Sequence, residues 1–127
     1  MMHILYIGIG GFFGATARYM VSKYLNNIIS YFPLGTLAVN VSGSFILGFI
    51  IYSISYGKSV PTNLRDMITI GFIGAFTTMS TLSYESFRLA ELNELLISAI
   101  NIFLNIILCL LAVYFGKELA LLISKSS

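Results

Sequence analysis

Charged residues are scarce in this chain. Of its 127 residues, only 9% are Asp, Glu, Lys or Arg, whereas 57% are hydrophobic. A soluble domain carries about 25% charged residues. A soluble fold with so little charge could not keep its surface in water, so lipid is the solvent for most of the chain. The formal net charge of +2 provides no basic patch, and we expect no nucleic-acid partner.

Residues that commonly carry catalysis or bind metals are also rare. The sequence has one cysteine, Cys109, and one histidine, His3. A single cysteine cannot close an intramolecular disulfide. No nucleophile–base pair and no set of metal-binding side chains stands out. The sequence therefore argues against an enzyme.

Four long apolar stretches are present instead. About 20 apolar residues span a bilayer as an α-helix, and a helix satisfies its own backbone hydrogen bonds in lipid. We predict an all-α membrane protein whose single domain, residues 1–127, contains four transmembrane helices. Their approximate bounds are residues 3–22, 34–56, 64–89 and 95–123. No Lys or Arg precedes the first stretch, which favours a span over a cleaved signal peptide.

The basic residues divide almost evenly between the two sides of the membrane. The side with both termini has Lys58, Arg65, Lys117 and Lys125, and the other has Arg18, Lys23 and Arg88. This is a weak positive-inside bias. Two hypotheses follow: the chain inserts in both directions and pairs antiparallel, or features other than charge fix one direction.

Polar residues inside the spans are informative because lipid tolerates them only with a partner or a function. In the first span, Gly10 and Gly14 form a small-xxx-small face for close helix packing. Arg18 follows one turn later. It either extends toward the interface or attracts anions.

The second and fourth spans each carry a polar stripe. Thr36, Asn40, Gly43, Ser44 and Gly48 form a stripe with spacings of three or four residues, on one face of a helix. Such a stripe packs against another helix or lines a water-filled path, and the amide donors of Asn40 suit an anion. In the fourth span, Asn101 is typical of interhelical hydrogen bonding, while the deeper Asn105 suits a polar path.

Residues 71–85 form the most unusual segment, with two glycines and a run of hydroxyl side chains inside an apolar span. This pattern predicts a broken third helix whose freed backbone groups face a cavity or an ion. The alternative is a helix whose hydroxyls bond to its own carbonyls. Glu85 is either a proton-coupling carboxylate or a paired group near the interface.

Three motifs together resemble the fluoride channels called Fluc, or CrcB. They are GGFFGATARY at residues 10–19, PLGTLAVN at residues 33–40, and the segment 71–85. The resemblance covers essentially the whole chain. It implies an antiparallel, dual-topology homodimer with two pores in a microbial cell membrane. Such a dimer exports fluoride passively and so lowers cytoplasmic fluoride.

The resemblance also implies site residues. A structural sodium ion at the dimer centre would be held by the backbone carbonyls of Gly74 and Thr77. Neutral donors suit fluoride, since a pore must replace its water without binding it too tightly. With Asn105 from the polar stripe, we expect the fluoride pathway to comprise Arg18, Asn40, Met79, Ser80, Thr81, Leu82, Ser83, Glu85 and Asn105.

At two of these positions the sequence departs from the family. The family motif Thr-Thr-Phe-Ser-Thr-Phe-Ser is here residues 77–83, TTMSTLS, with Met79 and Leu82 in place of the rings. A phenyl edge can contact an anion, whereas Met79 offers a polarizable thioether and Leu82 less. Three hypotheses remain open: conduction by the polar groups alone, poor conduction, or a heterodimer whose partner supplies the rings.

Two other functions compete with a channel. A small proton-coupled multidrug exporter is also short and four-helical, but it needs a carboxylate in the first helix. This helix has none, and Arg18 would repel a cation. The second competitor is a non-conducting subunit in which every polar stripe only joins helices.

Overall fold

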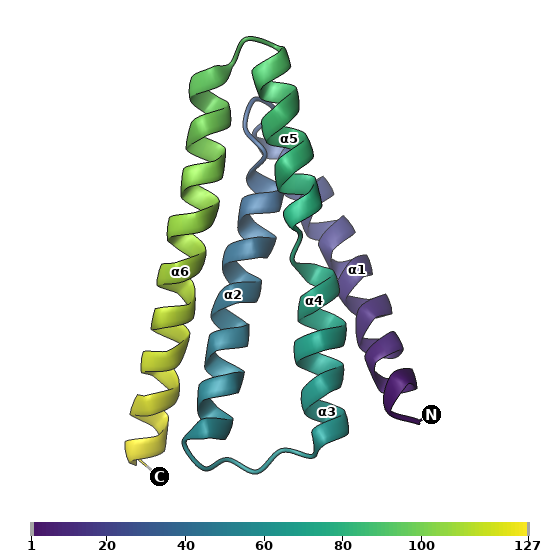
Figure 1. The fold of residues 1–127 in the computed structure, drawn as a ribbon, viewed down its shortest axis with the longest axis vertical. Helices are drawn as coiled ribbons and strands as arrows, with labels where there is room; N and C mark the ends of the chain where they lie inside the picture. The colour runs from purple at the N-terminus through teal and green to yellow at the C-terminus, as the bar shows by residue number, and fades with distance from the viewer. Residues whose placement is uncertain (1, 127) are drawn as a thin grey trace.

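The computed structural model describes residues 2–126, and within this range every regular element is a helix (Figure 1). Four helical segments are long and apolar enough to cross a membrane: Met2–Ile28, Leu34–Ser55, Thr62–Glu91 and Leu95–Ser126. The prediction of an all-helical, four-span protein is therefore confirmed. The first and fourth helices extend past the predicted residues 22 and 123, because a helix continues into the interface after its apolar stretch ends.

The first, second and fourth spans are single helices, and the third is composite. The single helices are α1 (Met2–Ile28), α2 (Leu34–Ser55) and α6 (Leu95–Ser126). The third span consists of α3 (Thr62–Asp66), the π-helix η1 (Met67–Ile73), α4 (Gly74–Phe76) and α5 (Met79–Glu91). The 22 residues of α2 rise about 33 Å, enough for the hydrocarbon core.

Glycines allow α2 and α6 to pack backbone to backbone. A methyl group at Gly48 of α2 would lie 2.6 Å from the Val113 carbonyl oxygen of α6. One at Gly116 of α6 would collide with the Phe45 carbonyl oxygen of α2. Close approach of this kind increases van der Waals contact, which drives helix association in lipid.

A second close contact joins α1 to the third span. Methyl groups at Gly10 and Gly14 would collide with the carbonyl oxygens of Met67 and Phe72. The predicted small-residue face is thus confirmed, and its partner is the π-helix. The two carbonyl oxygens belong to residues that are five positions apart, whereas the two glycines are four apart. This difference suits the wider turn of a π-helix.

The third span is interrupted between α4 and α5. Thr77 and Thr78 are both extended, with φ and ψ of −82° and 156°, and of −153° and 121°. α2 lies beside this interruption (Figure 1). Gly43 permits the approach, because a methyl group there would collide with the Thr77 side chain.

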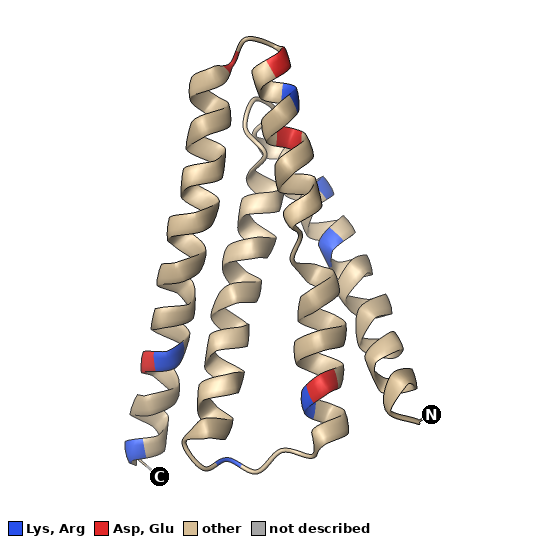
Figure 2. Cartoon of the chain, viewed as in Figure 1, with Lys and Arg blue, Asp and Glu red and all other residues tan. Residues whose placement is uncertain are grey.

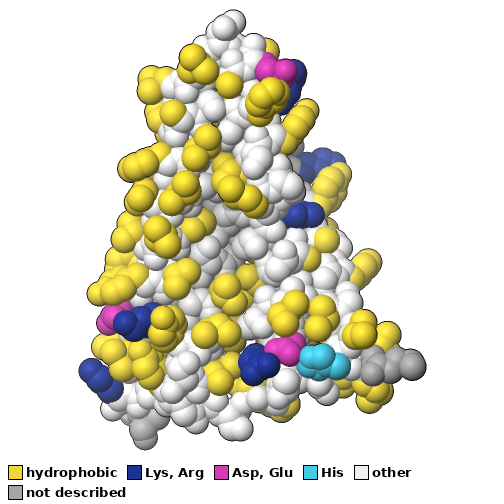
Figure 3. Space-filling model, viewed as in Figure 1, with side chains coloured by type: hydrophobic (Ala, Val, Ile, Leu, Met, Phe, Trp, Pro, Cys, Tyr) yellow, Lys and Arg dark blue, Asp and Glu magenta, His cyan; other side chains and the backbone are white. Residues whose placement is uncertain are grey.

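Charged residues gather toward the two ends of the bundle and leave the middle of α2, α4 and α6 without charge (Figure 2). At one end His3 contacts Asp66 at 3.0 Å and Asn63 at 2.8 Å, which ties α1 to α3. At the other end Asn26 accepts a hydrogen bond from the Gly35 amide at 2.8 Å. Apolar side chains cover much of the visible surface between the ends, as a lipid-facing protein requires (Figure 3).

Candidate functional site: an uncharged cavity at the helix interruption

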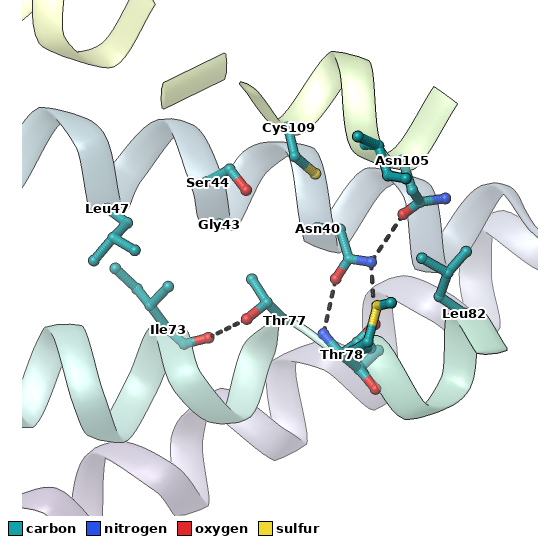
Figure 4. A pocket seen from close by; sticks show the side chains of 12 residues that line it. Asn40, Gly43, Ser44, Leu47, Ile73, Thr77, Thr78, Leu82, Asn105 and Cys109 are labelled. Atoms are coloured by element: carbon teal, nitrogen blue, oxygen red, sulfur yellow. Dashed lines mark hydrogen bonds between the residues drawn. The ribbon is translucent and has the colours of Figure 1, made fainter. Parts of the chain in front are cut away.

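The interruption in the third span opens onto a cavity of about 320 Å³ between α2, η1, α5 and α6 (Figure 4). Among the residues that the structure describes, no charged side chain lines it. Its polar lining residues are Asn40, Ser44, Thr77, Thr78 and Asn105, and its apolar ones are Gly43, Leu47, Ile73, Met79, Leu82, Ile106 and Cys109. The cavity therefore brings the polar stripe of the second span to the hydroxyl-rich segment of the third.

Asn40 pairs with the backbone polar groups at the interruption. Its Oδ1 accepts a hydrogen bond from the Thr78 backbone N–H at 2.8 Å, and its Nδ2 donates to the Thr78 carbonyl at 3.1 Å. The same nitrogen donates to Asn105 Oδ1 at 2.9 Å (Figure 4). Both amide hydrogens of Asn40 are thus donated within the protein. The side chain lines the cavity, and its donors satisfy the backbone where the helical hydrogen bonds stop.

A chain of buried polar side chains continues from Asn40 along α6. Asn105 Nδ2 donates to Asn101 Oδ1 at 3.1 Å and to the Asn101 carbonyl at 3.0 Å. Asn101 Nδ2 donates to Ser86 Oγ at 3.0 Å, back on α5. Asn101 therefore has the interhelical role that its position predicts.

Thr78 is the N-cap residue of α5, and its side chain belongs to a cluster of hydroxyl groups. Its Oγ1 accepts from the Thr81 backbone N–H at 3.2 Å, the usual bond of a helix N-cap. The same oxygen lies 3.0 Å from Thr81 Oγ1 and 3.2 Å from Ser80 Oγ. Ser80 and Thr81 therefore both contact Thr78, which links them to Asn40, but neither lines the central cavity.

Two helix ends of opposite polarity meet at the interruption. The N–H of Thr78 donates to Asn40, so the Gly74 carbonyl does not receive its usual bond from the residue four positions on. The first N–H groups of α5 also lack intrahelical acceptors. The freed carbonyl suits a cation, and the helix N-terminus suits an anion.

Comparison with known proteins adds a second, independent observation. The family model described as "CrcB-like protein, Camphor Resistance (CrcB)" matches residues 5–117. The chain belongs to the CrcB family. Proteins named fluoride-specific ion channel FluC are similar along nearly their whole length. In Methanococcus maripaludis such a protein is 51% identical over 92% of this chain and 94% of its own.

Two further relatives carry the same name. The Methanocaldococcus jannaschii protein is 48% identical over 96% of this chain and 97% of its own. The Campylobacter lari protein is 45% identical over 89% and 93%, respectively. Membership in this family and four helices able to span a membrane make the chain a multi-pass membrane protein.

Both residues that replace the phenylalanines of the CrcB motif lie on the cavity wall. Met79 is 71% exposed, and Leu82 is 4% exposed. The two also line an adjoining cavity of about 390 Å³ between α5 and α6. Phe76 does not replace the missing rings, because it is buried and stacks on Phe72 at 5.7 Å between ring centroids. Ser83 lines only the adjoining cavity, and its hydroxyl donates to the Met79 carbonyl.

The remaining predicted site residues lie away from the central cavity. Glu85 lines a third cavity, of about 290 Å³, together with Asn26, Pro33 and Arg88. Its Oε2 is buried and has no hydrogen-bond partner among the described residues. Arg18 is half-buried on α1 and lines none of these three cavities.

Two residues of the site, Thr78 and Ser86, were missed from the sequence. Both lie in the hydroxyl-rich third span, but nothing in the sequence distinguishes Thr78 from its neighbours. The distinguishing feature is tertiary: the N–H and the C=O of Thr78 both lie within hydrogen-bond distance of Asn40. Ser86 lies eight residues further along α5, and only the packing of α5 on α6 brings it to Asn101.

Proposed function

We propose that this chain is a fluoride-selective channel that exports fluoride passively across the cell membrane and lowers its cytoplasmic concentration. The observation that carries the proposal is the uncharged cavity at the helix interruption, where Asn40 binds the backbone of Thr78. The names of the CrcB relatives support fluoride as the ion.

The chemistry of the cavity suits a small anion that must also leave. Neutral donors replace part of the water around fluoride, whereas a fixed cation would hold it too tightly. The hydroxyls of Ser80 and Thr81 adjoin the cavity through Thr78 without lining it, and the first N–H groups of α5 lie at the same end of that helix. Asn40 and Asn105 contribute mainly by keeping these groups in place, since their amide hydrogens bind within the protein.

Glu85 would lie at one end of the path, and Arg18 would attract anions at its mouth. Glu85 lies one turn beyond Thr81 on α5, where its third cavity has Arg88 on its wall. The Glu85 carboxylate and the Arg88 guanidinium carry opposite charges. The carboxylate would offset the attraction of the guanidinium, so the entrance would not bind the anion too tightly. Ser83 and the wall residues Met79 and Leu82 would complete the path.

We further propose an antiparallel, dual-topology homodimer with a structural sodium ion at its centre. The freed Gly74 carbonyl fits such an ion, because Na⁺ prefers oxygen ligands and Gly74 is exposed rather than covered by its own chain. Thr77 is the neighbouring expected ligand, and it is half-buried. When bound, the ion would supply positive charge that balances the carbonyl dipoles facing it.

A heterodimer is the second candidate, and a specific observation favours it. Met79 is highly exposed at a position where the family motif has a ring. A partner chain could cover this surface with aromatic side chains of its own. The exporter hypothesis has less support, because α1 contains no Asp or Glu that could exchange protons for a cation.

Efflux from liposomes tests the proposed function. The purified chain is reconstituted in vesicles loaded with either fluoride or chloride, and release is followed with an ion-selective electrode. We expect fluoride release without chloride release. Silence that a second CrcB chain relieves would establish the heterodimer, and release that requires a proton gradient would establish the exporter.

A further inference from the structure

We infer that Asn101 is a positioning residue: it fixes the amide of Asn40 and thereby the start of α5. It does so through a chain of side-chain hydrogen bonds that the backbone of α5 closes into a ring. The ring leads from Thr78 to Asn40, Asn105, Asn101 and Ser86, and the backbone of α5 returns it to Thr78. Its effect on flux rests on the proposed channel function, but the ring itself does not.

The ring ties α5 to its neighbours at two points. Asn40 of α2 binds Thr78, the N-cap residue of α5. Asn101 of α6 binds Ser86, which lies eight residues after Thr78. Eight residues of helix rise about 12 Å. Two anchors this far apart control the tilt of α5 as well as its depth, which a single anchor at Thr78 does not.

Each amide in the ring has only one favourable orientation. Thr78 offers Asn40 both an N–H donor and a C=O acceptor, and neither backbone group can exchange roles. The orientation of Asn40 then requires Asn105 to present its oxygen, and Asn105 requires the same of Asn101. Reversal of one amide would place two oxygens or two NH₂ groups in contact, so the orientations are coupled.

Burial makes this coupling strong. The exposed fractions are 0% for Asn101, 3% for Asn105 and 4% for Ser86. A polar group left unpaired in such a site is costly, since no water can replace the lost partner. Asn101 itself does not line the central cavity, so it acts there through Asn105 and through its bond to Ser86.

Side-chain NMR and efflux measured on the same variants test this role. The chain has seven asparagines, so ¹⁵N-asparagine labelling in micelles gives few NH₂ signals, and loss of one pair in Asn40→Gln assigns Asn40. Ser86→Ala removes the acceptor of Asn101, and Ser86→Thr retains the hydroxyl. Ser98→Ala is the matched control, because Ser98 donates to the Ser86 carbonyl outside the ring.

We expect Asn101→Leu and Ser86→Ala to shift the Asn40 signals and to lower fluoride flux about tenfold, as the loss of one strong buried interhelical bond would. Ser86→Thr and Ser98→Ala should leave both readouts near wild type. If Asn101→Leu does not fold, Ser86→Ala alone decides the matter.

Two results would overturn the inference. One is a loss of flux in Asn101→Leu or Ser86→Ala while the Asn40 signals do not shift. The other is a Ser86→Thr variant whose flux is as low as that of Ser86→Ala. If the wild-type chain releases no fluoride, the proposed function fails, and the Asn40 signals still decide whether Asn101 positions that amide.

Discussion

The side-chain amide of Asn40 binds both backbone polar groups of Thr78, accepting from its N–H at 2.8 Å and donating to its carbonyl at 3.1 Å. A residue of α2 therefore supplies the two backbone hydrogen bonds that Thr78 lacks within the third span. Unpaired backbone groups are costly in lipid. An interrupted helix in mid-span consequently depends on this side chain.

Asn40→Asp should abolish fluoride flux. The substitution places a fixed negative charge on the cavity wall, and it also turns an oxygen toward the Thr78 carbonyl and Asn105 Oδ1, where Nδ2 now donates. Liposome efflux measures the loss. Asn27→Asp is the control, since Asn27 is exposed at the end of α1. Unchanged flux in Asn40→Asp would remove Asn40 from the pathway.

Gly43→Ala should lower both stability and flux. The added methyl group would collide with the Thr77 side chain and lie 3.3 Å from the Phe76 ring. Overpacking of this kind costs about 1–3 kcal/mol. Thermal unfolding in detergent, followed by circular dichroism, measures the effect.

Gly8→Ala is the matched substitution, because beyond the backbone of its own helix no described atom lies within 4 Å of the added methyl group. It should leave the unfolding temperature equal or slightly higher, since alanine favours a helix over glycine by about 1 kcal/mol. Equal losses in the two variants would mean that the contact between Gly43 and Thr77 is not specific.

Met79→Phe should raise fluoride flux and leave the fold intact. Met79 is exposed on the cavity wall, so a ring fits there without repacking, and its positive edge offers an additional contact to the anion. Initial efflux rates measure the gain, and Met79→Leu is the control of similar size. A ring that leaves the rate unchanged would indicate that the polar groups alone determine it.

Replacement of sodium should weaken the dimer. If the Gly74 carbonyl holds Na⁺ between two chains, transfer to N-methylglucamine salts at equal ionic strength should increase the monomer fraction and reduce flux. Cross-linking in liposomes measures the first effect and efflux the second. Dimers that persist without any alkali cation would contradict a structural sodium site.

Composition predicted much of the fold. Few charges and four apolar stretches were sufficient for four helices, because spanning a bilayer leaves few alternatives. The Gly10 and Gly14 face was likewise readable from its spacing, which depends only on helix geometry. The π-helical turn opposite it was not, since that conformation depends on the backbone of α1 lying against Met67 and Phe72.

The site was less accessible from sequence than the fold. Asn40 and the hydroxyl-rich segment were evident as polar groups in apolar spans, but the direction of each hydrogen bond depends on tertiary packing. From the sequence, the amide hydrogens of Asn40 were predicted to suit an anion. In the structure they are donated to the Thr78 carbonyl and to Asn105 Oδ1. Asn101 and Ser86 meet only because the chain reverses direction between α5 and α6. The turn contains Asn93, whose φ is 64°.

Current through planar bilayers tests the central claim, a passive and fluoride-selective path, most directly. With a fluoride gradient, a chloride gradient of opposite sign and a pH difference imposed together, the reversal potential identifies the ion that moves. The account predicts reversal at the equilibrium potential of fluoride, unaffected by pH. Reversal that follows chloride, or that shifts with the pH difference, would contradict it.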